Sequence, residues 1–404
     1  MKILRAASKR LEEFIDRERL VETAVKLIEV PSPTGEAGAV ADRLAGILAD
    51  EGFAVERPAA GHAKAPAVVA RLDSGRPGRV IQWDGHLDTV HLPFAAPRVD
   101  GARIRGSGAC DMKGGLAAAV EALRALRDSG LLASGCVLLT AHDLHEAPWG
   151  FGEQLGELIR NGYFGNAVLI PEPLSDRLPV VGRGAAVWRA RVRRAGPPIH
   201  EVMRSADEPD VIAAAAELVL RLRRLDAEVS SRRDPLAGAE SVFIGKVDGG
   251  EMYNQSPSEC RLEGTRRWLP ATRIGDVERE LQAAASEIAA RTGATVEMDF
   301  RPIRDAFALD LEDPFVRAFE RAHETVAGER LPTGPKPFVD DGNAFWALAR
   351  VPAITHGPLA GGQHTTDEWV SIDDLARVAR VYALTAAAYS EAPAPRRPSK
   401  VSPR

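Results

Sequence analysis

The feature that most restricts the fold is a series of four short apolar runs in roughly the first 180 residues. They cover residues 68–72, 80–83, 137–140 and 167–170, and a helical pattern occupies residues 115–126 between the second and the third. Short, uniformly apolar runs are typical of strands buried on both faces, and strands that alternate with helices form parallel sheets. We therefore expect an α/β domain with a mixed, mostly parallel sheet flanked by helices.

A second pattern begins near residue 183, where apolar and arginine residues alternate through 188–193. The order strand, helix, strand, strand, helix, strand follows to about residue 300, which is the ferredoxin-like α+β arrangement. The chain then returns to helix and strand patterns of the first kind. We expect a first domain formed by residues 1–182 and 301–390, an inserted domain at 183–300, and a disordered tail at 391–404.

Composition excludes several classes of protein. The chain has 404 residues, enough for two domains, and its formal net charge of −5 gives no reason to expect nucleic acid as a partner. Its three cysteines are far apart and form neither a disulfide framework nor a thiolate zinc site. The sequence contains no run of about 20 apolar residues, the length needed to span a membrane, and the N-terminus lacks the apolar core of a signal peptide. A cytoplasmic location is the expectation.

Histidine, aspartate and glutamate gather in five short segments, at 85–90, 106–115, 141–150, 170–173 and 361–368, several of them directly after a predicted strand. Each segment alone has an ordinary explanation, such as a turn, a helix cap or a charged surface loop. Together they supply two imidazoles and three carboxylates. That ligand set suits two borderline divalent cations that share one carboxylate.

These segments, in this order, resemble the M20 family of metallopeptidases and deacylases. The carrying motifs are Gly-His-Leu-Asp-Thr-Val, Gly-Ala-Cys-Asp-Met-Lys-Gly-Gly, His-Glu, Glu-Pro and Gln-His-Thr-Thr-Asp-Glu, and the resemblance runs from about residue 19 to 390. It implies that His86, Asp111 and Glu172 bind one metal ion. Asp111, Glu146 and His364 would bind the other. The implied cofactors are two divalent ions, with zinc expected and cobalt or manganese as alternatives.

The resemblance also assigns roles outside the ligand set. It implies a zinc-exopeptidase-like first domain, with Asp88 as the carboxylate behind a metal-binding histidine. The inserted domain matches the family's lid, which also forms the interface of a homodimer. Within it, His200 matches a histidine that reaches the partner's active site and stabilises the oxyanion. Asn254 and Arg267 match positions that hold a substrate carboxylate.

The third motif departs from the family pattern, which has two adjacent glutamates, the first acting as the general base. Here the pair is His145-Glu146. His145 could serve as the base, since imidazole is well matched to neutral pH. His142 or Asp143 could take the role from the same loop. In the third interpretation the protein binds metal and ligand but turns over slowly.

The function that these features predict is hydrolysis of a C–N amide bond in a small substrate by a metal-bridging hydroxide. Asp-Gly-Asn at residues 341–343, where deacetylase-like members often have an arginine, favours an N-acyl amino acid or dipeptide with a free carboxylate. One alternative is a specialised amidohydrolase that acts on a non-peptide substrate with His145 as the base. Another is a catalytically weak, metal-dependent protein whose function is to bind a ligand.

Overall fold

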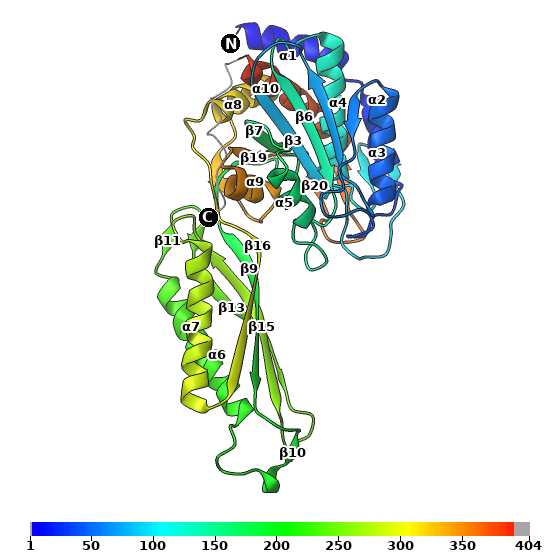
Figure 1. Ribbon diagram of the computed structural model, residues 1–404. Helices are drawn as coiled ribbons and strands as arrows, with labels where there is room; N and C mark the ends of the chain where they lie inside the picture. Colours follow the sequence, from blue (N-terminus) through cyan, green and yellow to red (C-terminus); the bar gives the residue numbers. More distant parts are fainter. Residues whose placement is uncertain (1, 392–404) are drawn as a thin grey trace. The chain divides into compact units, whose positions relative to one another are not determined.

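The computed structural model describes residues 2–391, and its chain divides into two compact units (Figure 1). The first unit comprises the described residues up to 180, residues 309–334, and those from 340 onward. The second comprises residues 181–308 and 335–339. The expected tail at 391–404 lies, apart from Glu391, outside the described residues.

A six-stranded mixed sheet forms the centre of the first unit, as the apolar runs predicted. Its strands, in spatial order, are β1 (Ala54–Glu56), β2 (Val68–Asp73), β6 (Cys136–His142), β3 (Val80–His86), β7 (Ala167–Ile170) and β19 (Ala353–Thr355). β6, β3, β7 and β19 run parallel to one another, whereas β2 runs antiparallel to both β1 and β6. The carboxyl ends of four parallel strands therefore meet at one edge of the sheet.

Helices cover both faces of this sheet. They are α1 (Lys2–Phe14), α2 (Arg17–Ile28), α3 (Gly38–Asp50), α4 (Lys113–Ser129), α5 (Glu153–Arg160), α8 (Pro314–Ala327), α9 (Asp341–Ala349) and α10 (Ile372–Ser390). Trp83 of β3 contacts Tyr382 of α10 on one face. Leu138 of β6 packs against Leu158 of α5 on the other face. Leu138 is on that face because it pairs with Gln82, the neighbour of Trp83, and side chains alternate between the two faces along a strand.

Two smaller sheets are formed by the short strands that remain outside the six-stranded sheet and the second unit's own sheets. One is four-stranded and contains β20 (Ala360–Gly361), β21 (Trp369–Ser371), β5 (Arg103–Arg105) and β4 (Arg98–Asp100) in that order. The other is three-stranded and contains β17 (Phe307–Ala308), β8 (Leu178–Gly182) and β18 (Thr333–Pro335) in that order. The four-stranded sheet carries the loop between β20 and β21, which holds His364.

The second unit is an antiparallel sheet with two helices packed on one face (Figure 1). The sheet order is β13 (Ser241–Gly249), β15 (Glu259–Trp268), β9 (Gly184–Arg193) and β16 (Thr295–Arg304), and the helices are α6 (Val211–Val229) and α7 (Ile274–Thr292). Alternate residues of β9, such as Trp188 and Ala190, lie in the core against these helices, while Arg189 is exposed. This is the ferredoxin-like arrangement that the sequence predicts.

The second unit also contains two short two-stranded sheets and extends beyond the expected residue 300. One pairs β10 (Ile199–His200) with β14 (Gln255–Ser256), the other pairs β11 (Arg233–Asp234) with β12 (Gly238–Ala239), and a 3₁₀ turn follows β10 at Glu201–Met203. The extension arises because β16 continues to Arg304 and β17 then pairs with β8. None of the helices among residues 2–391 is both long and apolar enough to cross a membrane.

Candidate metal centre

Three of the predicted metal-binding side chains meet at the carboxyl edge of the central sheet. His86 is the last residue of β3, Glu172 follows the end of β7, and Asp111 precedes α4. His86 Nε2 lies 3.0 Å from Oδ1 of Asp111 and 3.4 Å from Oε1 of Glu172. All three side chains are buried.

The other two predicted ligands approach the same aspartate from its opposite oxygen. His364 Nε2 lies 3.3 Å from Oδ2 of Asp111 and 3.3 Å from Oε2 of Glu146. The two oxygens of Asp111 therefore face two different imidazoles. This is the arrangement expected of a carboxylate that bridges two cations.

The spacing of these atoms fits divalent cations. Nitrogen and oxygen ligands at about 2.0–2.2 Å in tetrahedral geometry lie about 3.3 Å from one another. The four nitrogen-to-oxygen distances range from 3.0 to 3.4 Å. In addition, Oε2 of Glu172 is buried without a hydrogen-bond partner among the described residues. Imidazole and carboxylate groups so placed suit zinc, cobalt or manganese.

Two local features bring Asp111 to its place. Gly115, in the first turn of α4, passes so close to the exit of β7 that a Cβ atom there would lie 2.0 Å from the carbonyl oxygen of Pro171. Only glycine permits this approach, which sets the start of α4 beside Glu172. The loop before α4 is fixed by Glu368, whose Oε2 accepts hydrogen bonds from the backbone N–H groups of Cys110 and Asp111.

Two side chains of the centre, Glu172 and His364, have raised pKa values and so hold protons tightly when no cation is bound. Burial raises the pKa of Glu172 well above its usual range, and the charge of Asp111 adds to the effect. Hydrogen bonds with Asp111 and Glu146 raise the pKa of His364 to about 10. Burial opposes charge on Asp111, but His364 and His86 still hold the pKa of Asp111 well below its usual range. Metal binding would displace these protons.

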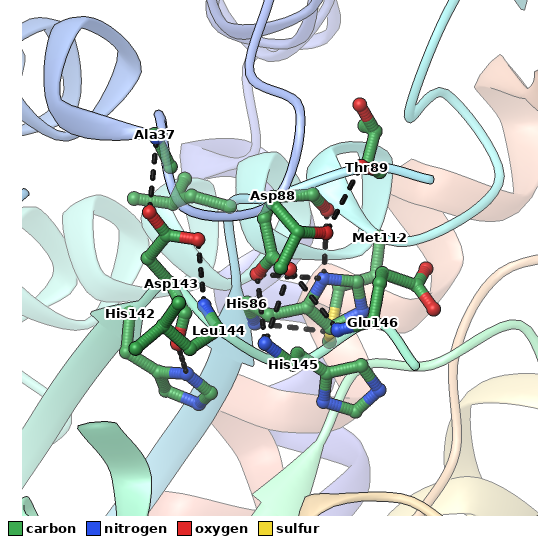
Figure 2. A network of polar contacts seen from close by, with 12 residues as sticks. Ala37, His86, Asp88, Thr89, Met112, His142, Asp143, Leu144, His145 and Glu146 are labelled. Atoms are coloured by element: carbon green, nitrogen blue, oxygen red, sulfur yellow. Dashed lines mark hydrogen bonds and ion pairs between the residues drawn. The ribbon is translucent and has the colours of Figure 1, made fainter. Parts of the chain in front are cut away.

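Asp88 contacts His86 through a different atom from the one expected. Nδ1 of His86 lies 2.9 Å from the backbone oxygen of Asp88 and 3.7 Å from its Oδ1. The Asp88 carboxylate instead accepts hydrogen bonds from the backbone N–H groups of His145 and Glu146 (Figure 2). The carbonyl can fix the His86 tautomer. The carboxylate ties the His145-Glu146 loop to the end of β3.

His145 lies beside the metal centre and has a partner that the sequence did not reveal. Its ring stacks on that of His86, with centroids 3.9 Å apart and planes 9° from parallel. Nδ1 of His145 lies 2.9 Å from Oδ1 of Asp341, at the start of α9, and Nε2 lies 3.9 Å from Oε1 of Glu172. The one sequence signal for a functional role of this segment was its polar Asp-Asp-Gly-Asn sequence at 340–343.

The structure argues against Asp143 as the base. Its carboxylate accepts hydrogen bonds from the backbone N–H groups of Ala37 and Leu144 (Figure 2). It also accepts one from the backbone N–H of Gly35 and contacts His62. These contacts make it a clamp between two loops. His142 is fully buried and lies between Asp84 and Asp341. Burial opposes a charge on His142, but the carboxylates of Asp341 and Asp84 raise its pKa to about 10.

The three predicted residues of the inserted domain all belong to the second unit. His200 is at the end of β10 and Asn254 directly precedes β14, and Nδ2 of Asn254 lies 3.3 Å from Nε2 of His200. The two residues therefore lie at the two-stranded antiparallel sheet that β10 and β14 form. Arg267 lies on β15 and is partly buried, and burial, together with the charge of Arg183, lowers its pKa.

A mixed sheet with metal-binding side chains at its carboxyl edge and an inserted ferredoxin-like unit is the architecture of metal-dependent hydrolases that act on amide bonds. The family model of peptidase family M20/M25/M40 matches residues 83–388. The chain belongs to this family, as the motifs predicted, and is a hydrolase with a site for divalent metal ions.

Individual relatives agree with this assignment. The chain is 27% identical to a succinyl-diaminopimelate desuccinylase of Methylobacterium sp. (strain 4-46), over 91% of this chain and 96% of the relative. Among solved structures, aminopeptidase PepT from Bacillus cereus superposes with a TM-score of 0.77 at 19% identity, covering 93% of this chain and 99% of PepT. An M20 metallo-carboxypeptidase from Sulfolobus solfataricus gives 0.74 at 14% identity, covering 92% and 99%. These two structures share the fold.

Proposed function

We propose that this protein uses two divalent cations, zinc in the first instance, to hydrolyse an amide bond in a small substrate that carries a free carboxylate. The observation that carries the proposal is the position of Asp111, whose two oxygens lie 3.0 Å from His86 and 3.3 Å from His364. His86, Asp111 and Glu172 form one ligand set, and Asp111, Glu146 and His364 the other. When bound there, the cations polarise the scissile carbonyl and make water nucleophilic near neutral pH.

His145 is the proposed general base. The hydrogen bond between its Nδ1 and Asp341 directs Nε2 toward the ligands of the metal centre. Stacking on His86 fixes the plane of the ring. A neutral imidazole held in one tautomer can accept a proton from water and pass it to the leaving amine, as the family's glutamate does. Burial of His142 and the backbone contacts of Asp143 favour His145 over both alternatives.

Arg267 is the proposed partner of the substrate carboxylate. Its position on β15 lies opposite Ala185 of β9, so Arg183 is its diagonal neighbour on the same face. Among the described residues no carboxylate lies within ion-pair distance of Arg267. Two guanidinium groups close together, one of them partly buried, favour an anionic ligand, and the fork of arginine suits a carboxylate.

A homodimer through the second unit is the proposed assembly. β13 is an edge strand of the sheet, and two of its large apolar side chains are exposed, Phe243 by 62% and Val247 by 53%. Exposed apolar edge strands pair readily with another chain. In such a dimer the segments with His200 and Asn254 would serve the partner's site, with His200 stabilising the oxyanion and Asn254 binding the substrate carboxylate. The cytoplasmic location stays a prediction.

The relatives suggest the substrates to test, because they include a desuccinylase, an aminopeptidase and a carboxypeptidase. Metal-stripped protein should be reloaded separately with zinc, cobalt and manganese and assayed on N-succinyl and N-acetyl amino acids, dipeptides and tripeptides. Metal-dependent release of a free amino acid supports the proposal. Turnover of non-peptide amides alone would favour the specialised amidohydrolase. Tight binding without product would favour a ligand-binding protein.

A further inference from the structure

A second group of side chains that could hold a metal ion lies close to the metal centre, to which Asp341 is linked through His145. Asp84 on β3, His142 at the end of β6 and Asp341 at the start of α9 are all fully buried. One ligand atom from each lies within 4.8 Å of the other two. His142 Nε2 is 3.2 Å from Oδ2 of Asp341 and 3.4 Å from Oδ2 of Asp84. These distances match those of the metal centre above and the spacing of about 3.3 Å around a tetrahedral cation.

These atoms are close together but are not joined by hydrogen bonds of good geometry. Nε2 of His142 and Oδ2 of Asp84 are both buried, and neither has a hydrogen-bond partner among the described residues. Buried polar atoms without partners are rare because each costs about 1–3 kcal/mol. Here an imidazole nitrogen and a carboxylate oxygen point to a common place from adjacent strands. A cation at that place would satisfy both.

The remaining polar atom of each side chain is held by the protein. The hydroxyl of Thr140 donates to Oδ1 of Asp84, and it is oriented to do so because its oxygen accepts from Gln82. Oδ1 of Asp341 pairs with Nδ1 of His145. Nδ1 of His142 lies 3.3 Å from the backbone oxygen of Asp143. Metal-binding histidines and carboxylates in proteins are oriented by contacts of this kind.

We propose that Asp84, His142 and Asp341 bind a further divalent cation of the zinc type, separate from the metal centre. Two carboxylates and one imidazole converge at one buried place, where an ionised carboxylate without a balancing cation is costly. The mixture of one nitrogen and two oxygens suits zinc, cobalt or manganese. The cation would hold Asp341 in place, and Asp341 in turn orients His145. The site stands on its own contacts and does not require the proposed hydrolysis.

The metal content of the full chain tests this proposal. After removal of metal, saturation with zinc and gel filtration, the wild type should retain about three ions per chain, one more than a two-metal centre holds. Asp84→Asn, which keeps the shape of the side chain, should lose one ion. Asp111→Asn, which disables the metal centre, should retain about one ion. An unchanged count in Asp84→Asn would mean that His142 is held by a proton alone and would overturn the site.

A second measurement does not depend on any variant. Zinc-loaded wild-type crystals should give an anomalous peak at the zinc edge within bonding distance of Asp84, His142 and Asp341, in addition to the peaks at Asp111. Peaks at Asp111 alone would reject the further site and leave the metal centre intact. A peak at the buried cluster without peaks at Asp111 would support the site and reject the proposed centre, so the two proposals fail separately.

Discussion

Nδ1 of His145 lies 2.9 Å from Oδ1 of Asp341, a residue 196 positions further along the chain. The contact joins the loop after β6 to the start of α9. It leaves Nε2 of the same ring on the side of Glu172, 3.9 Å from its Oε1. A carboxylate that accepts from one imidazole nitrogen fixes the tautomer of the ring, so that the other nitrogen can accept a proton. The pair can replace the glutamate that the family has at this position.

The first prediction concerns the proposed base. We expect His145→Ala to lower kcat by about 10²–10⁴-fold, the usual contribution of general base catalysis. Metal content should not change, because the ring of His145 is not among the proposed ligands. Steady-state kinetics and elemental analysis of the same preparations measure both quantities.

The matched variant is His145→Glu, which introduces the family's residue. It should recover part of the activity that His145→Ala loses, because a carboxylate in this position can also take a proton from water. Turnover by His145→Ala equal to that of the wild type would exclude the base role altogether.

The second prediction concerns the shared ligand. Asp111→Asn should lose zinc from both positions of the metal centre and lower activity by more than about 100-fold, because one carboxylate serves both. Gln363→Ala should have a smaller effect, about 10- to 100-fold in metal affinity, since Nε2 of Gln363 only donates a hydrogen bond to Oδ2 of Asp111 at 2.7 Å. Competition with a chelator gives the affinities. Equal affinities in wild type and Asp111→Asn would contradict the bridging role.

The third prediction concerns substrate binding in the second unit. Arg267→Lys keeps the charge but loses the fork, and should lower kcat/KM for carboxylate substrates by about 10- to 100-fold, mainly through KM. Arg189→Lys, at an exposed position of β9 in the same sheet, is the matched control and should not change either constant. The same loss for a substrate whose carboxylate is amidated would show that Arg267 acts on something else.

The strand ends pointed to the segments that hold the proposed ligands, and the resemblance to the family then assigned the ligands. His86 and Glu172 follow apolar runs that are typical of buried strands, and the carboxyl ends of parallel strands share one edge. Asp111 and His364 are in glycine-containing loops whose motifs resemble those of the family. These are local signals, so a single sequence carries them.

The buried cluster gave no comparable signal. Asp84 lies in β3 one residue past the apolar run that predicted this strand, and Asp341 is the first residue of α9, a helix that the periodicity did not reveal. Their proximity to His142 arises only from the pairing of β3 with β6 and from the packing of α9. The extension of the second unit to residue 308 was missed for the same reason, since β17 is a two-residue strand defined by its pairing with β8.

The fourth prediction concerns assembly. Phe243→Glu places a charge on the exposed edge strand β13 and should convert a dimer into a monomer, as sedimentation velocity would measure. Leu220→Glu on α6 is the control, because Leu220 is exposed to a similar extent, 60% against 62%, but is not on the sheet edge. Dissociation by both variants, or by neither, would place the interface elsewhere.

A buried histidine away from the metal centre makes the fifth prediction, on stability. His356 follows β19, is fully buried, and neither of its ring nitrogens has a hydrogen-bond partner among the described residues. Its ring is surrounded by those of Phe319, His323 and Tyr382. Burial, together with the charges of Arg377 and His323, holds the pKa of His356 well below its usual range. The folded protein therefore keeps this imidazole neutral in mild acid.

In the unfolded chain the same group titrates near pH 6.5. Below that pH the unfolded state binds a proton that the folded state does not, so the free energy of unfolding falls as the pH falls. His356→Phe removes the group and keeps an aromatic ring among its neighbours. We expect the free energy of unfolding of the wild type to fall by about 2 kcal/mol more than that of the variant when the pH is lowered from 7.5 to 5. Urea unfolding of metal-stripped wild type and variant at both pH values measures this difference. A difference that does not change with pH would mean that His356 is protonated in the folded state or stays neutral in both.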